Sequence, residues 1–183
     1  MQRGTVLPKG AVSYDGFQKV YETTLGATAS SVTITGLNGD VDVEYKFAIR
    51  QVGGVASEQS GVRINNDSTA GIYGYQDLSA INTTIFPERS TSNTFYFAPQ
   101  EALEEGDLLS TNITIYAKTG YVRTALLETT ADISSTTVSD VNFAGWSYND
   151  TSTNVTSLVL VSSAAGGLGI GTYIALYTKK ART

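Results

Sequence analysis

Carboxylates are the side chains that could perform acid–base chemistry in this sequence, because it contains no histidine and no cysteine. The absence of both excludes a Ser-His-Asp triad, a thiolate nucleophile and a Cys/His zinc site. A carboxylate pair of the glycosidase kind remains available. The segment PQEALEEGD supplies the candidates Glu101, Glu104, Glu105 and Asp107. We expect them to form the solvated face of a short helix that Gly106 ends, and we predict no catalytic residues and no enzymatic activity.

Oxygen ligands for a cation have one candidate cluster. Asn38, Asp40 and Asp42 stand at alternate positions, as calcium ligands do, but the loop glycine and the distal bidentate Glu of an EF-hand are missing. A turn that runs into an exposed strand face explains the spacing more simply. The segment Gly167–Gly171 has the spacing G-x-G-x-G and is followed by a strand pattern, so it does not match a nucleotide loop. We therefore predict no metal and no cofactor.

Two aromatic residues are candidates for carbohydrate contact. Trp146 and Tyr148 occupy alternate positions of an expected strand, with Asn142, Asn149 and Asp150 nearby. Exposed aromatic rings beside Asn and Asp side chains are typical of sugar-binding sites. A single Trp is more often a core residue, so we expect the core position and keep sugar contact as the alternative.

The first 16 residues predict an extended arm, which precedes one domain over residues 17–183. The arm is polar, punctuated by Gly and Pro, and without periodicity. Its apolar side chains can offset the entropy of ordering only by burial against a surface, and its cations could pair with acidic groups there. The candidate assembly residues are Arg3, Val6, Leu7, Lys9, Val12 and Tyr14. We expect the arm to dock on a neighbouring subunit or lattice; the alternative is that it folds back on its own domain.

Composition favours an all-β domain. Charged residues are 16% of the chain, and the Gly, Ser, Thr, Asn and Tyr content suits strands and turns. The net charge of −5 disfavours a nucleic-acid partner. The N-terminus has no apolar run, so we expect no secretory signal.

Strand patterns recur along the whole chain. Alternation is clearest over residues 41–51, where Val41, Val43, Tyr45, Phe47 and Ile49 share one face. Asn38-Gly39 predicts a hairpin, and so does Thr119-Gly120. Residues 79–92 are polar and contain Pro87, which predicts a long loop or an edge strand. The other expected strands cover 17–25, 31–37, 61–65, the region of Tyr73 and Tyr75, 94–98, 109–118, 121–128, 131–138 and 140–148.

The stretch from Val155 to Lys179 is long and apolar enough to suggest a membrane span. Glycines at its centre argue against a spanning helix. Its outer parts predict two strands, 155–163 and 172–179, which we expect to pair as the central hairpin of the core. The expected fold is a single jelly-roll-like antiparallel β-sandwich with an N-terminal arm, without membrane insertion.

Three stretches resemble a family of tailed-bacteriophage virion proteins: GLNGDVDVEYKFAIR, VRINNDSTAGIYGYQDLS and VTSLVLVSSAAGGLGIGTYIALYTKK. The shared features are a GLxGD entry to a long strand, an NND turn and a closing GT.I.LY strand, and the similarity extends from Ser31 to Lys180. The resemblance implies a jelly-roll structural or accessory protein of the virion, without catalytic residues. We expect a capsid decoration or cement protein, a homotrimer whose partners are other capsid or tail proteins. The alternative is a tail-fibre or receptor-binding module that recognises host-surface carbohydrate.

Overall fold

The computed structural model describes residues 5–6, 16–56, 59–93, 96–97, 102–132 and 138–180. Over these ranges the chain forms thirteen β-strands and no helix. The strands are β1 (Thr5–Val6), β2 (Gln18–Thr24), β3 (Ser31–Thr35), β4 (Glu44–Val52), β5 (Ser60–Ile64), β6 (Tyr73–Ile81), β7 (Thr84–Asn93), β8 (Tyr96–Phe97), β9 (Leu108–Tyr116), β10 (Arg123–Asp132), β11 (Asp140–Tyr148), β12 (Ser157–Ser162) and β13 (Tyr173–Lys179).

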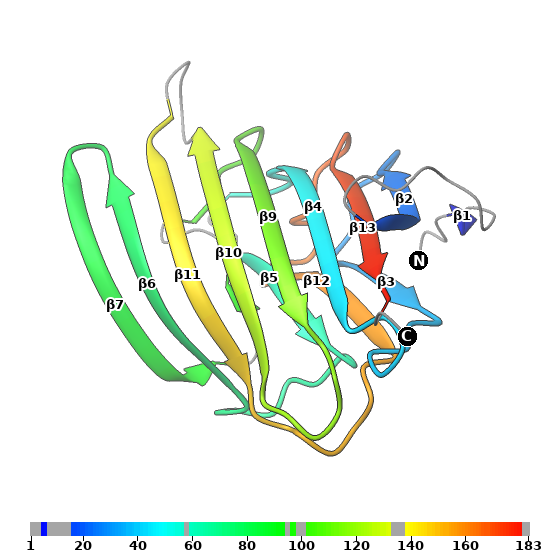
Figure 1. Ribbon diagram of the computed structural model, residues 1–183. Helices are drawn as coiled ribbons and strands as arrows, with labels where there is room; N and C mark the ends of the chain where they lie inside the picture. Colours follow the sequence, from blue (N-terminus) through cyan, green and yellow to red (C-terminus); the bar gives the residue numbers. More distant parts are fainter. Residues whose placement is uncertain are drawn as a thin grey trace.

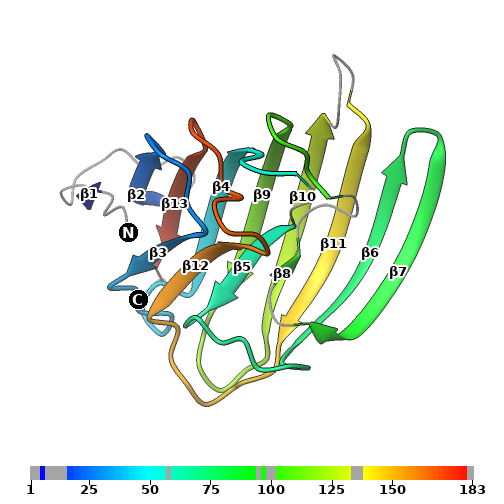
Figure 2. The same cartoon turned by 180° about the vertical axis from the view of Figure 1, so that it is seen from behind.

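The strands form two sheets that lie one behind the other (Figure 1). The large sheet has the order β1-β2-β13-β4-β9-β10-β11-β6-β7, and the small sheet has the order β3-β12-β5-β8. Neighbouring strands in both sheets are antiparallel. Seen from behind, β7 lies beyond the small sheet (Figure 2). The fold is therefore all-β, an antiparallel sandwich of jelly-roll type, as the sequence predicts.

The core lies between the sheets and is built by alternation. On β4, Tyr45, Phe47 and Ile49 are buried, whereas Lys46 and Arg50 are exposed. This confirms the predicted face from Tyr45 onward. Extending that face back to Val41 is wrong, because Val41 precedes the strand and is 46% exposed. On β12, Leu158, Val159, Leu160 and Val161 are all buried, as expected for a strand covered on both sides.

The expected hairpin between the last two strands is wrong. β12 pairs with β3 and β5 in the small sheet, whereas β13 pairs with β2 and β4 in the large sheet. The Gly-rich segment between them crosses from one sheet to the other at one end of the sandwich. Gly169 N donates to Val52 O, and Gly171 N donates to Leu25 O. In the described part of the chain no helix is long and apolar enough to cross a membrane.

Glycine is required at this crossing because backbones meet closely there. A Cβ at Gly54 would lie 2.1 Å from the carbonyl oxygen of Gly166, well inside van der Waals contact. Gly54 N also donates to Gly167 O at 2.8 Å. The β4–β5 loop therefore packs directly on the crossing segment, and a side chain at Gly54 would push the two apart.

The Asn38-Gly39 pair does not form a hairpin either. It joins β3 in the small sheet to β4 in the large sheet. Asn38 O accepts hydrogen bonds from Val41 N and Asp42 N, and Gly39 N donates to Val155 O. A Cβ at Gly39 would lie 2.6 Å from the carbonyl oxygen of Ala117, so this glycine is needed for packing. The Thr119-Gly120 hairpin is confirmed, because β9 pairs with β10 on either side of it.

The acidic segment before β9 is a turn, which corrects the expected helix over its described residues, 102–107. Leu103 is fully buried beside Leu109. Gly53 N donates to Asp107 O, and this bond fixes the turn against the end of β4. Tertiary contacts thus override a local helix preference.

The polar stretch over residues 79–92 is the end of β6 followed by the edge strand β7, so the edge alternative is confirmed, Pro87 included. Of the strand expected over 131–138, the first two residues belong to β10, and residues 133–137 lie outside the described ranges.

Candidate functional site

The outer face of the large sheet, which points away from the small sheet, is the surface with the most exposed apolar side chains. On β10, β11, β6 and β7 the residues that alternate with the core include several large apolar side chains among polar ones. We define the outer patch as Leu78, Ile85, Pro87, Leu126, Val141 and Phe143.

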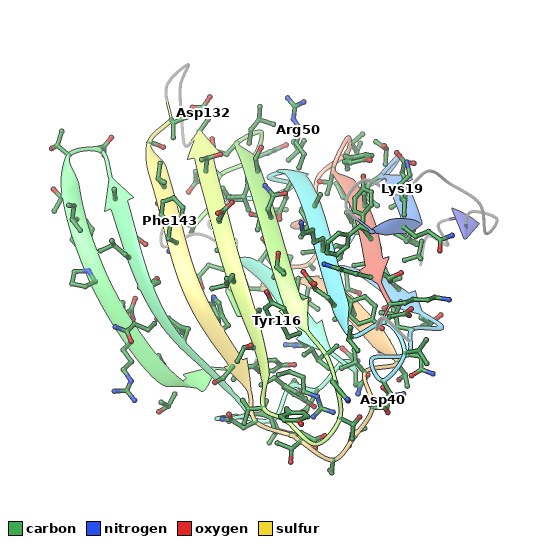
Figure 3. All side chains as sticks on the ribbon, in the orientation of Figure 1. Lys19, Asp40, Arg50, Tyr116, Asp132 and Phe143 are labelled. Carbon is green, nitrogen blue, oxygen red and sulfur yellow. The ribbon has the colours of Figure 1, made fainter. Side chains whose placement is uncertain are left out.

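Strand register brings the outer-patch residues together. Phe143 lies directly opposite Leu78, and Leu78 lies opposite Pro87. Phe143 is 55% exposed and Leu78 is 51% exposed. Figure 3 labels Phe143 on the front of β11. Single exposed apolar residues are ordinary on protein surfaces, but a contiguous set of this kind marks a contact surface.

Side-chain parity in the sequence could have revealed the patch. Phe143 and Trp146 are three residues apart on one strand, so their side chains point to opposite faces and only one of them can face the core. Leu126 and Leu127 are neighbours and face opposite sides for the same reason. In each pair one large apolar side chain must point outward, and the sequence analysis did not draw that conclusion.

The other half of the outer face, on β2, β13 and β4, is cationic. The Nζ atoms of Lys46 and Lys179 lie 4.3 Å and 5.2 Å from the centroid of the Phe17 ring. Lys19 and Tyr173 donate hydrogen bonds of 2.6 Å and 2.8 Å to Glu22.

The bonds to Glu22 set the protonation of this half. The bond from Lys19 holds the pKa of Glu22 below its usual range and raises the pKa of Lys19. Burial, followed by the bond to Glu22, raises the pKa of Tyr173 to about 12. Lys19 is therefore paired with Glu22, and Lys179 Nζ lies 3.7 Å from Glu44 Oε2, so this half is charged, in contrast to the apolar half.

The connections at one end of the sandwich are joined by side-chain caps, and Asn65 is the most connected. Its Oδ1 accepts from Thr156 N at 2.8 Å and from Ser157 N at 3.1 Å, and its Nδ2 donates to Asn154 O at 2.8 Å. Its φ of 53° is left-handed, which Asn tolerates better than most residues. The NND motif thus ties the β5–β6 turn to the β11–β12 loop.

The carboxylates of these connections cap backbone groups as well. Asp40 Oδ1 accepts from Thr119 N at 2.9 Å. Asp67 accepts from Thr69 N at 2.8 Å and from the Tyr148 hydroxyl at 2.9 Å. The GLxGD and NND motifs therefore have structural roles, in agreement with the structural use expected for them.

These caps shift the titration of the groups involved. The backbone bond from Thr119 holds the pKa of Asp40 below its usual value, and bonds from Thr153 and Ser152 do the same for Asp150. Burial, followed by the bond to Asp67, raises the pKa of Tyr148. The carboxylates are thus held as anions that accept backbone hydrogen bonds, which is a structural role rather than that of an acid–base pair.

Arg123 is a buried cation in the same region that the sequence analysis did not single out. It is 0% exposed, and its Nη2 donates to Thr153 O and, at 3.5 Å, to Thr119 Oγ1. Arg123 alternates with Ala125 and Leu127 on β10, and this spacing places it on the same buried face as they are. Arg123 links the β9–β10 and β11–β12 loops.

A buried polar layer lies on the inner face of the large sheet. Asn142 Nδ2 donates to Asp77 Oδ2 at 3.1 Å and to Ser79 Oγ at 2.6 Å. Beside it, the hydroxyl oxygens of Thr111 and Thr129 lie 3.1 Å apart. These bonds join β9 to β10 and β11 to β6, and they support the register of each pair of strands.

Trp146 and Tyr148 lie in the core, which confirms the preferred position for Trp146. They are 4% and 1% exposed, and the Trp146 ring centroid lies 4.5 Å from that of Tyr75. Neither ring offers a face to a sugar. The candidate carbohydrate contact therefore has no exposed aromatic platform in this structure.

The other sequence candidates do not converge on one site. Glu104 and Glu105 are exposed, Asp107 accepts from Glu104 N at 2.8 Å, and Glu101 lies outside the described residues. Among the described residues, no three Asp or Glu side chains gather as a metal site would require.

Most of the arm candidates also lie outside the described ranges: Arg3, Leu7, Lys9, Val12 and Tyr14. Of the arm, Thr5 and Val6 pair with Glu22 and Tyr21 of β2, so this short piece adds to its own sheet. Arm docking on a neighbour stays a prediction.

Comparisons with known proteins identify no family. No family model matches the chain, and the search of curated proteins gave no match. Among solved structures, the galectin LEC-6 of Caenorhabditis elegans is 12% identical with a TM-score of 0.35, over 92% of this chain and 98% of the galectin. A mutant of the alginate lyase Aly36B in complex with alginate tetrasaccharide is 12% identical with a TM-score of 0.29, over 93% of this chain and 83% of the lyase. Likeness at this level carries no argument about function.

Proposed function

We propose that this protein acts by assembly, as a non-enzymatic structural component of a tailed-bacteriophage particle, and that it decorates or cements the capsid. Its partners are then other virion proteins. The resemblance of the three sequence motifs supplies the class of particle. An exposed apolar surface of the structure supports contact with a partner.

The observation that carries the proposal is the outer patch. Exposed apolar side chains on β10, β11, β6 and β7 adjoin one another across the register, and Ile85 and Leu126 are 66% and 60% exposed. Keeping such a surface in water is unfavourable by roughly 25 cal/mol for each Å² of apolar area. A structural protein that stays bound in a particle would cover this surface permanently.

The test is recovery of the protein with density-purified particles from cells that produce it, measured by mass spectrometry. We expect the protein at a fixed copy number per particle. We expect Phe143→Ser to reduce incorporation while the isolated protein keeps its melting temperature, because Phe143 is an exposed residue. Absence of the wild-type protein from the particles would overturn the proposal, as would normal incorporation of the Phe143→Ser protein.

A further inference from the structure

The outer patch is bordered by one acidic and one basic residue on opposite sides. Glu128 lies on β10 directly opposite Phe143, and Arg89 lies on the edge strand β7 opposite Gln76. Both side chains are exposed, and neither makes an ion pair within the described residues. The register row of Glu128 continues through Phe143 and Leu78 to Pro87, and Arg89 lies two residues further along β7.

We propose that the outer patch binds the outer patch of a second copy of this chain, face to face, about a two-fold axis that runs along the strands between β11 and β6. This operation places β10 of one copy over β7 of the other. Phe143 then faces the partner's Leu78, and Glu128 faces the partner's Pro87, two residues along the strand from the partner's Arg89. The same contacts form twice, as in any isologous interface.

The charge pattern favours a second copy over an unrelated partner. The acidic flank of one copy meets the basic flank of the other only if the strand order is reversed between the copies. The proposed axis produces this reversal, because it places β10 over β7. The apolar rows match as well, because Phe143 and Leu78 are adjacent in one register row and exchange places across the axis. Two sheets stack face to face in this way at about 10 Å.

A second copy could instead pair with the free edge of β7, but the sequence of β7 disfavours such pairing. Pro87 removes a backbone donor, and Glu88 and Arg89 place charges on the strand. These are the features by which natural edge strands prevent strand addition. The face is therefore the better surface for self-association.

The first experiment measures the mass of the purified full chain by sedimentation equilibrium. We expect dimers of the 19.4 kDa chain and a dissociation constant raised at least about tenfold by Phe143→Ser or by Leu78→Ser. The matched control is Tyr116→Ser, which removes a side chain 47% exposed on the same face but outside the patch. A monomer at all concentrations, a trimer, or a dimer unaffected by either patch variant would overturn the proposal.

The second experiment is a charge exchange, which needs no change in the apolar contact. Glu128→Arg alone and Arg89→Glu alone should each weaken the dimer about tenfold, because each brings like charges together on the same flank of the interface. The double variant should return to within about threefold of the wild-type affinity. If the double variant loses as much affinity as the two single variants lose together, the two-fold geometry is contradicted.

The inference proposes a two-fold dimer in place of the homotrimer expected from the sequence resemblance. It deepens the proposed assembly function and rests on it for the biological meaning of the contact. The two can fail separately. A dimer with the expected variants but no protein in particles would overturn the particle role alone. Protein in particles combined with a monomer in solution would overturn the self-contact alone.

Discussion

Asn65 shows how much a single side chain can hold in this fold. Asn65→Ala removes the Oδ1 atom that accepts three hydrogen bonds and the Nδ2 atom that donates one. It also places Ala at a left-handed φ, which Asn tolerates better. We expect a loss of about 2–4 kcal/mol in the free energy of unfolding. Denaturant melts measure it.

Asn66 provides the matched control for that loss. Its φ of 56° is also left-handed, but its side chain is exposed and makes no hydrogen bond within the described residues. Asn66→Ala therefore carries the backbone strain alone. Equal losses for the two variants would show that the Asn65 amide does not hold the β11–β12 loop.

The β4 alternation gives a second prediction at the residue scale. Phe47 is 1% exposed, so Phe47→Ala should cost about 3–5 kcal/mol, whereas Arg50→Ala on the exposed face should stay within about 0.5 kcal/mol. Lys46 is also exposed on this face. The structure makes Arg50 the better control, because Lys46 contacts the Phe17 ring. Similar shifts of the denaturant midpoint would mean that the register of β4 is wrong.

At the scale of elements, the crossing between β12 and β13 depends on close backbone contact. Gly54→Ala would place a Cβ 2.1 Å from Gly166 O, so we expect a loss of at least about 2 kcal/mol in unfolding free energy. Gly145→Ala is the control, since no atom lies within 4 Å of its added Cβ and its φ is not positive. If Gly54→Ala has the melting temperature of wild type, the crossing segment can move away from the added Cβ at little cost in stability.

Sequence periodicity located the strands better than it located their partners. The β12 and β13 patterns are both correct, yet their pairing is not, because alternation reports which face is buried and not which strand lies alongside. The hairpin predicted at Asn38-Gly39 is wrong for a similar reason: the pair does form a turn, but the turn connects the two sheets. The outer patch was missed because residues around Pro87 were interpreted by polarity, while the apolar neighbours of Phe143 come from strands distant in sequence.

At the scale of the whole molecule, the two ends of the sandwich are closed by different means. One end is closed by backbone contacts of the Gly-rich crossing, which contain no titratable group. The other end is closed by caps that depend on the charge of Asp40, Asp67 and Asp150. Acid should therefore act directly on the caps of the second end, whereas the backbone contacts of the crossing do not titrate.

The pH dependence of stability follows from these caps. For Asp67, burial raises the pKa, but bonds from Thr69 and Tyr148 outweigh it, and the pKa lies below its usual value. A carboxyl with a lowered folded pKa contributes stability above its unfolded pKa and loses it as the pH falls through the folded pKa. We expect the melting temperature to be flat near neutral pH and to fall progressively below about pH 5.

Asp150→Asn assigns part of that fall to one cap. Asp150 Oδ1 accepts bonds from Ser152 N and Ser152 Oγ, and these bonds are stronger to the ionised carboxylate. The variant should therefore melt lower than wild type at pH 7, and the difference should shrink as the pH falls, because acid protonates the wild-type carboxylate. Glu105→Gln, which neutralises an exposed turn carboxylate, should leave the pH profile unchanged. A gap between Asp150→Asn and wild type that stays constant from pH 7 to acid unfolding would mean that the charge of Asp150 does not hold this end of the molecule together.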